Sequence, residues 1–110
     1  MKVDFREILY IEARKNYTRL VMEPPRPTIM VLVTLKQWER VLPVENFCRI
    51  HRGYIVSIEK VQSFDNKYAY LGGEKISIGE QYRGALPGAV TILVNEGVRK
   101  EPMELDNLLQ

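Results

Sequence analysis

The first third of the chain carries the two-residue repeat of β-strands, interrupted by loop-forming residues. Residues 7–13 (EILYIEA) are apolar on both faces, which is typical of a strand that is covered on both sides. Residues 17–22 alternate between polar and apolar after a basic tip, and they predict a hairpin with the preceding strand. Three prolines predict a loop over residues 23–28, and residues 29–33 predict a third, buried strand.

The period changes to about 3.6 residues at Thr34, where a short amphipathic helix is predicted. Thr34 and Gln37 match a capping box, in which a hydroxyl and an amide side chain satisfy free backbone donors at the helix start. Pro43 is expected to end the helix. The apolar residues expected to pack against the strands are Leu35, Trp38, Val41 and Leu42. The outer face carries charges of both signs and is expected to face solvent.

The second half of the chain predicts further short strands separated by turns. The expected strands are residues 47–50, 60–64, 68–71 and 75–78. Residues 54–58 predict a turn or short helix, and Asp65–Asn66 and Gly72–Gly73 predict turns of a meander. These elements indicate a mostly β fold of elongated antiparallel strands in several small sheets, with one short amphipathic helix packed against them.

The end of the chain predicts less regular structure. Gly79 is expected to open a last short helix over residues 80–86, and Pro87 and Gly88 are expected to stop it. Residues 89–94 are one more strand candidate.

A net charge of +2 conceals an uneven distribution of charge along the chain. Residues 1–86 hold 14 Lys and Arg against 10 Asp and Glu, a net charge of +4, whereas residues 87–110 hold 2 against 4, a net charge of −2. The basic residues that cluster at predicted loops are Arg14, Lys15 and Arg19, then Arg49 and Arg52, and later Arg83. Their placement at loops, more than their number, favours a nucleic-acid partner.

Size and composition argue for one domain outside the membrane. A chain of 110 residues that is 45% hydrophobic can bury a core of its own. No apolar run approaches the roughly 18 residues of a membrane span, and residues 1–6 lack the apolar core of a signal peptide. The single Cys48, expected to be buried in a strand, agrees with a reducing compartment. We therefore expect a cytoplasmic protein with no membrane partner.

Too few chemical groups are present for catalysis or metal binding. The only histidine is flanked by arginines, which disfavour its protonated form, and no nucleophile with a base and an orienting group is recognisable. One histidine and one cysteine are too few ligands for a zinc site. Gly72–Gly73 lie between two strands, so a hairpin turn is favoured over a phosphate cradle. We expect no enzymatic activity, metal, cofactor or small-molecule substrate.

Residues 46–57 (NFCRIHRGYIVS) are the most informative segment. Phe47 and Ile50 are expected to anchor the segment, and Arg49, His51 and Arg52 are expected to point outward. The planar fork of an arginine can grip guanine O6 and N7 together or pair with a phosphate. The structural alternative is that these arginines form surface ion pairs with Glu45 or Glu59.

Four segments in a fixed order carry a resemblance to a known family: ILYIEARKNYTRLVM, TLKQWERVLP, FCRIHRGYIVSIEKV and KISIGEQYRGAL. The strongest pattern positions are Phe47, Arg49, Ile50, His51, Arg52, Tyr54, Ile55 and Val56. Between about Phe5 and Leu86 the chain resembles the LytTR DNA-binding domain, found in bacterial response regulators and in some free-standing regulators. It departs from the family pattern at Gly53, where serine is usual, at Ser57, where asparagine is usual, and at Gly79–Glu80, which replaces a Ser-Arg pair.

The resemblance implies a sequence-specific transcriptional regulator that binds promoter repeats in double-stranded DNA. Family members read DNA with loops that enter successive major grooves, and a homodimer on paired sites is compatible with this. The DNA-binding residues that the resemblance implies are Arg14, Lys15, Asn16, Tyr17 and Thr18 in a first loop, His51 and Arg52 in a second, and Gln81 and Arg83 in a third.

The resemblance also divides the chain. Residues 1–86 are assigned to the DNA-binding domain, and residues 87–110 to a C-terminal extension that forms a strand plus a short helix or a flexible tail. An alternative function stays open, namely a non-enzymatic protein-interaction or dimerisation module on the same fold. It is favoured by Glu80 and the acidic tail, and in it the strand candidate at residues 89–94 would extend the sheet of a partner.

Overall fold

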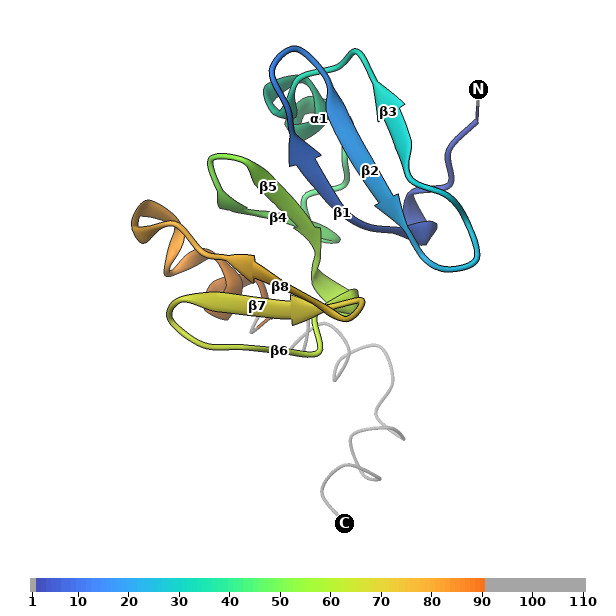
Figure 1. The fold of residues 1–110 in the computed structure, drawn as a ribbon. Helices are drawn as coiled ribbons and strands as arrows, with labels where there is room; N and C mark the ends of the chain where they lie inside the picture. Colours follow the sequence, from blue (N-terminus) through green and yellow to red (C-terminus); the bar gives the residue numbers. More distant parts are fainter. Residues whose placement is uncertain (1, 91–110) are drawn as a thin grey trace.

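Two antiparallel sheets form the body of the protein (Figure 1). The structure is a computed structural model, and it describes residues 2–90. The strand order is β3-β2-β1-β5-β4 in the first sheet and β6-β7-β8 in the second. The strands are β1 (Ile8–Ala13), β2 (Thr18–Met22), β3 (Ile29–Val31), β4 (Phe47–His51), β5 (Tyr54–Ser57), β6 (Ser63–Phe64), β7 (Tyr68–Leu71) and β8 (Glu74–Ser77). The helical elements are η1 (Phe5–Glu7), α1 (Leu35–Val41), η2 (Ile58–Lys60), η3 (Glu80–Tyr82) and a helical segment over residues 85–90. The predicted mostly β fold is confirmed.

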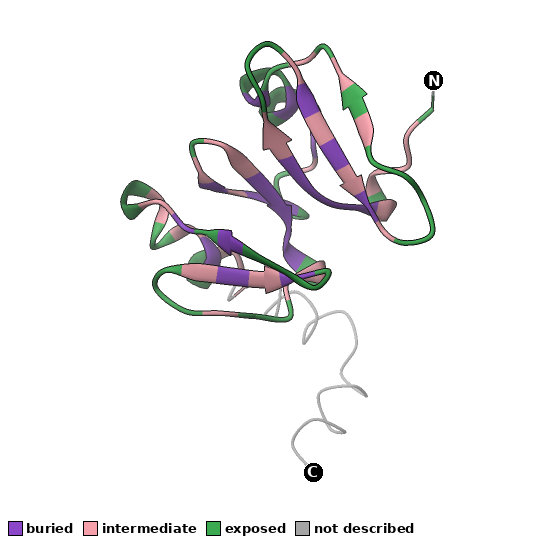
Figure 2. Ribbon diagram, viewed as in Figure 1, coloured by how far each residue is buried: buried purple, intermediate pink, exposed green. Residues whose placement is uncertain are grey.

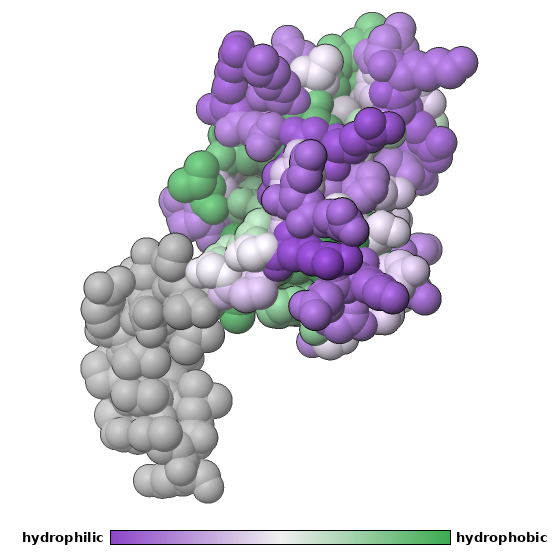
Figure 3. Space-filling model, turned by 90° about the vertical axis from the view of Figure 1, so that its left-hand side faces the viewer, coloured by the Kyte–Doolittle hydropathy of each residue, from purple (hydrophilic) through white to green (hydrophobic). Residues whose placement is uncertain are grey.

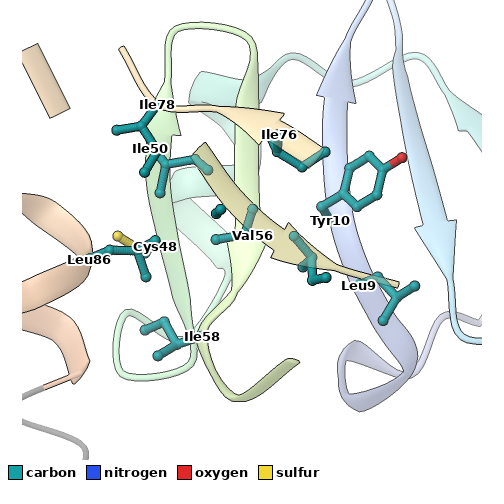
Figure 4. Packing of buried hydrophobic residues seen from close by; sticks show 11 residues of the cluster. Leu9, Tyr10, Cys48, Ile50, Val56, Ile58, Ile76, Ile78 and Leu86 are labelled. Atoms are coloured by element: carbon teal, nitrogen blue, oxygen red, sulfur yellow. The ribbon is translucent and has the colours of Figure 1, made fainter. Parts of the chain in front are cut away.

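The first sheet is the middle layer, with α1 on one face and the second sheet on the other (Figures 1 and 2). The core on the α1 side consists of Ile8, Ile11, Leu20, Met22, Leu35, Trp38, Leu42, Phe47 and Ile55. The core between the sheets consists of Leu9, Tyr10, Cys48, Ile50, Val56, Ile58, Ala69, Leu71, Ile76, Ile78 and Leu86 (Figure 4). Burial of each large aliphatic side chain favours the fold by roughly 1.5–3 kcal/mol.

Strand β1 is buried on both faces, as its apolar sequence predicts. Ile8 and Ile11 pack on the α1 side, whereas Leu9 and Tyr10 pack between the sheets. The pairing of β1 with β2 shifts register between Ile8 and Tyr10, which accounts for this departure from simple alternation. The central strand β1 is therefore packed on both faces over the residues that precede the first loop.

The capping box predicts the start of α1 correctly, but one residue of its predicted apolar face lies elsewhere. The Gln37 N–H donates to Thr34 Oγ1 at 3.1 Å, and the Thr34 N–H donates to Gln37 Oε1 at 2.8 Å. Leu35, Trp38 and Leu42 are buried as expected. Val41 is 59% exposed, because at about 100° per residue it lies roughly 120° around the helix from Leu35.

Two further predictions of secondary structure differ from the structure. The strand predicted at residues 29–33 is present but shorter, as the edge strand β3, and it is not fully buried: Ile29 and Val31 pack against the core on the α1 side, whereas Met30 alternates to the other face and is 64% exposed. Within residues 54–58, predicted as a turn or short helix, residues 54–57 form β5, which lies between β1 and β4. The unbroken apolar run in this segment reflects a strand covered on both faces.

The C-terminal part of the described chain is more helical than predicted. η3 spans only three residues, and a helical segment over residues 85–90 follows it. Pro87 and Gly88 do not stop this segment, because proline is compatible with the first turn of a helix, where backbone N–H groups have no intrahelical partner. Ala89 and Val90 are therefore helical and not the start of a strand; the rest of that candidate lies outside the described residues. Leu86 is 1% exposed and anchors the segment to the core between the sheets.

Candidate nucleic-acid interface

The three predicted loops lie along one side of the molecule (Figure 1). Because β1 and β4 both pair antiparallel with β5, they run in the same direction, and both end on this side. The Ala13 N–H donates to the Gly53 carbonyl at 2.8 Å, which ties the end of β1 to the β4–β5 turn. Sheet topology thus brings the first and second loops together although they are about 35 residues apart.

The third loop is attached to the second by an irregularity in β4. The β4–β5 register shifts between Arg49 and His51, so that Ile50 is an extra residue without a cross-strand partner. The Ile50 carbonyl accepts from the Gly79 N–H at 2.9 Å, and a Cβ added at Gly79 would lie 3.7 Å from His51 Cα. η3 therefore begins directly beside the histidine of the second loop.

Arg52 stands where the three loops meet. A surface hollow of about 460 Å³ separates it from the first loop and α1, and is lined by Arg14, Lys15, Asn16, Tyr17, Lys36 and Arg49 among others. A second hollow, of about 340 Å³, lies on the other side and is lined by His51, Arg52, Gly79, Glu80, Gln81 and Tyr82. Arg52 is exposed, and its side chain forms no ion pair within residues 2–90. Its guanidinium is therefore available to a partner that spans both hollows.

Arg49 does not point outward as predicted; it braces the second loop. Its Nε donates to the His51 carbonyl at 2.9 Å, and its Nη2 donates to the Arg52 carbonyl. Its Nη1 lies 2.6 Å from Glu39 Oε1 on α1. The predicted alternative of an ion pair is thus realised for Arg49, but with Glu39 instead of Glu45 or Glu59, because the side chain lies on the α1 face of the sheet.

The imidazole of His51 is held in one orientation. Its Nδ1 accepts from the Gly53 N–H at 3.0 Å, which assigns the proton of the neutral ring to Nε2. The ring of Tyr54 contacts it edge-on, with 5.5 Å between centroids. His51 lines the second hollow, and with Nδ1 occupied its Nε2–H is the ring donor left for an acceptor on a base edge or a phosphate.

The first loop presents some of its predicted residues and buries one. Lys15 and Asn16 are exposed, and Tyr17 is half-buried. Arg14 is exposed but its Nη2 lies 3.2 Å from Glu12 Oε1. Thr18 is a correction to the predicted contact set, because it is 1% exposed and its hydroxyl accepts from Trp38 Nε1 at 2.9 Å.

The third loop carries opposite charges at its tip. Gln81 and Arg83 are exposed, as is Glu80. The Arg83 guanidinium lies 3.8 Å from the Glu80 carboxylate, and half of its side chain is in contact with solvent. Glu80 therefore offsets part of the positive charge that Arg83 adds to this end of the interface.

Two residues near the loops were not predicted as part of the interface. Lys36, in the first turn of α1, lines the larger hollow, and only the docking of α1 against the sheet brings it there. Glu12 contacts Arg14, Arg19 and Tyr54. Hairpin register is a signal that could have found Glu12, because a turn after Ala13 places it opposite Arg19.

The Glu12 carboxylate remains ionised despite its position. Burial raises the pKa of Glu12, but hydrogen bonds from Arg19 and Tyr54 and the charges of both neighbouring arginines outweigh it, so the pKa lies below the ordinary value. The pKa of Tyr54 is raised by burial and by its bond to this carboxylate, so the phenol keeps its proton. The Glu12 carboxylate is thus a fixed negative charge behind the first and second loops.

The surface chemistry of the loop side agrees with a polar partner. The face that carries the loops is mostly hydrophilic, with hydrophobic patches near its margin (Figure 3). Within residues 2–90, no cluster of three or more His, Cys, Asp or Glu side chains could hold a metal ion. Among the same residues, no helix is long and apolar enough to cross a membrane.

A small β domain with exposed arginine and lysine and a half-buried histidine on three neighbouring loops defines a class of domain that can bind nucleic acid without a recognition helix. The sequence profile of the LytTr DNA-binding domain matches residues 1–90. The chain belongs to this family. A solved structure with the same fold is the LytTr DNA-binding domain of a methyl-accepting/DNA response regulator from Bacillus cereus. The two chains are 23% identical and superpose with a TM-score of 0.68, and the aligned region covers 76% of this chain and 81% of the other. No curated protein matches the chain significantly.

Proposed function

We propose that this protein is a sequence-specific transcriptional regulator that reads the major grooves of promoter DNA through loops. The observation that carries the proposal is the position of Arg52 between two hollows, exposed and without an ion pair within residues 2–90. An arginine in this setting can contact guanine on a base edge, while the other loops hold the flanking backbone.

The roles of the remaining interface residues follow from their chemistry. His51 offers a donor through Nε2 to a base or phosphate, and Asn16 and Gln81 offer amides suited to adenine. The cations assigned to phosphates are Arg14, Lys15, Lys36 and Arg83, and Tyr17 is placed against the sugar-phosphate backbone. Thr18 is left out, because its side chain is buried.

Selection of bound oligonucleotides from a random pool tests the proposal. We expect enrichment of a defined sequence, and Arg52→Ala should weaken binding to it by about 1–3 kcal/mol while relaxing the preference at one position. Arg40→Ala is the matched control, because Arg40 is exposed on α1, lines neither hollow beside Arg52 and loses the same charge. Flat enrichment, or equal losses for both variants, would contradict the proposal.

The number of copies on DNA and the cellular location are part of the same proposal. Enrichment of a repeated half-site would indicate two copies on DNA, and light scattering of the complex would give their number. A regulator of this kind works where its promoters are, which we propose is the cytoplasm of a bacterium. Residues 87–110 remain assigned to an extension of the DNA-binding domain, and the boundary at residue 86 stays a prediction.

A further inference from the structure

Glu12 lies where three adjacent strands meet behind the loops. Its partners across the sheet are Arg19 on β2 and Tyr54 on β5. The side chain is 18% exposed, and both of its oxygens are in use. Oε1 accepts from Arg19 and lies 3.2 Å from Arg14 Nη2, whereas Oε2 accepts from the Tyr54 hydroxyl at 2.9 Å.

The partners of this carboxylate lead to different loops. Arg14 is the first residue of the β1–β2 loop, and its backbone N–H closes that loop by donating to the Tyr17 carbonyl at 2.9 Å. Tyr54 is the first residue after the β4–β5 turn, and its ring lies edge-on to His51 with 5.5 Å between centroids. A continuous series of contacts thus runs from Arg14 through Glu12 and Tyr54 to His51.

A cluster that only stabilised the sheet would not need these partners. The Arg19 pair alone would satisfy one oxygen of Glu12 within the strands. The second oxygen instead fixes a tyrosine whose ring supports the imidazole, and the first is shared with an arginine that heads the neighbouring loop. Shared hydrogen bonds of this kind make the positions of their donors interdependent.

We propose that Glu12 is a positioning residue that couples the first and second loops of the DNA interface. This proposal rests on the proposed function. A phosphate that draws Arg14 away from Glu12 would change the hold of the carboxylate on Tyr54, and through it the orientation of His51. By linkage, a contact at His51 changes the affinity at Arg14 by the same factor. Specific DNA, which engages both loops, depends on Glu12 more than non-specific DNA does.

The coupling between the loops is tested first without DNA. Tyr54→Phe removes only the hydroxyl bond to Glu12 Oε2, and the backbone amide signals of the variant are compared with those of the wild type by NMR. We expect the amides of Lys15 and Asn16 to shift, although they lie about 38 residues away along the chain. Shifts confined to the second loop and its strands would overturn the proposal.

The consequence for recognition is tested with two DNA duplexes of equal length, the sequence enriched from the random pool and a scrambled one. Glu12→Gln should weaken binding to the enriched duplex about fivefold or more, while binding to the scrambled duplex is unchanged or stronger because one negative charge is lost. Glu45→Gln is the matched control, since Glu45 is exposed, changes the charge equally and forms no ion pair within residues 2–90. It should leave the ratio of the two affinities unchanged.

The outcomes separate this proposal from the proposed function. Equal weakening on both duplexes would reveal general damage to the fold and overturn the positioning role, as would no change on either. Should the pool yield no enriched sequence, the proposed function fails, and the amide shifts of Tyr54→Phe alone then decide whether Glu12 couples the loops. Because Tyr54→Phe keeps the aromatic ring, it retains the packing against Tyr10 and His51 and should fold.

Discussion

Replacing Arg49 with lysine should loosen the second loop without changing the charge of the protein. The Arg49 guanidinium holds two backbone carbonyls of the loop, those of His51 and Arg52, and is itself held by Glu39. A lysine ammonium is a single point on a flexible stem and cannot reproduce this planar, three-way arrangement.

The structure sets the size of the effect. A hydrogen bond to a charged group contributes about 1.5–3 kcal/mol when it is shielded from water, and Arg49 is 21% exposed. The pair with Glu39, whose side chain is 45% exposed, adds only about 0–1 kcal/mol. Lysine can keep one of these contacts, so we expect Arg49→Lys to lower the free energy of unfolding by about 1–2 kcal/mol.

Urea denaturation and DNA binding measure the two consequences. The urea concentration at the midpoint of unfolding should fall, while the dependence of the unfolding free energy on urea concentration stays unchanged. Binding to the enriched duplex should weaken, while binding to a scrambled duplex stays the same. Arg40→Lys, on the exposed face of α1, provides the control for an arginine-to-lysine change at a side chain that forms no ion pair within residues 2–90. The reasoning is refuted if Arg49→Lys and Arg40→Lys have equal stability and equal affinity for the enriched duplex.

Two further predictions concern stability. Gly72→Ala should destabilise the fold by at least about 1 kcal/mol more than Gly73→Ala. Both glycines have a positive φ, 58° at Gly72 and 76° at Gly73. Only at Gly72 would an added Cβ clash with a neighbour, because it would lie 2.7 Å from Leu9 Cδ1. Urea midpoints of the two variants measure this, and equal midpoints would contradict it. Because the pKa of Glu12 is lowered in the folded state, the ionised Glu12 side chain stabilises the fold above its ordinary pKa of 4.5. This contribution to the free energy of unfolding is lost as the pH falls through the folded pKa. The stability difference between wild type and Glu12→Gln should therefore shrink as the pH falls below 4.5 and through the lower pKa of the folded state, and a constant difference would count against the assignment.

Local sequence signals predicted the elements that local contacts build. The capping box of Thr34 and Gln37 and the tight turn at Gly72–Gly73 both follow from residues close in sequence. The errors lie where tertiary contacts decide. Residues 54–57 lie in the centre of the sheet only because β1 and β4 flank them, and residues 85–90 continue as a helix because Leu86 enters the core between the sheets.

The interface shows the same division between local and distant contacts. Charge clustering predicted the loops, and the loops are adjacent, but it could not separate side chains that face a partner from those that serve the fold. Thr18 was predicted to contact DNA and is buried beneath Trp38, because strand alternation turns its side chain toward α1. Arg49 was predicted to point outward, and only the position of Glu39 on the docked helix explains why it does not.

The basic residues of the loop face divide into those used within the protein and those left for a partner. Arg19 is paired with Glu12, and Arg49 with Glu39. Arg14 also contacts Glu12, but its side chain is 48% exposed and can still meet a phosphate. Lys15, Lys36 and Arg52 form no ion pair within residues 2–90. A count of positive charges in the sequence therefore overstates how many phosphates the interface can neutralise, and the salt-dependent, sequence-independent part of binding should be modest. The proposed discrimination among DNA sequences then depends mainly on the placement of Arg52 and His51, and that placement depends on the internal pairs that remove charge from the surface.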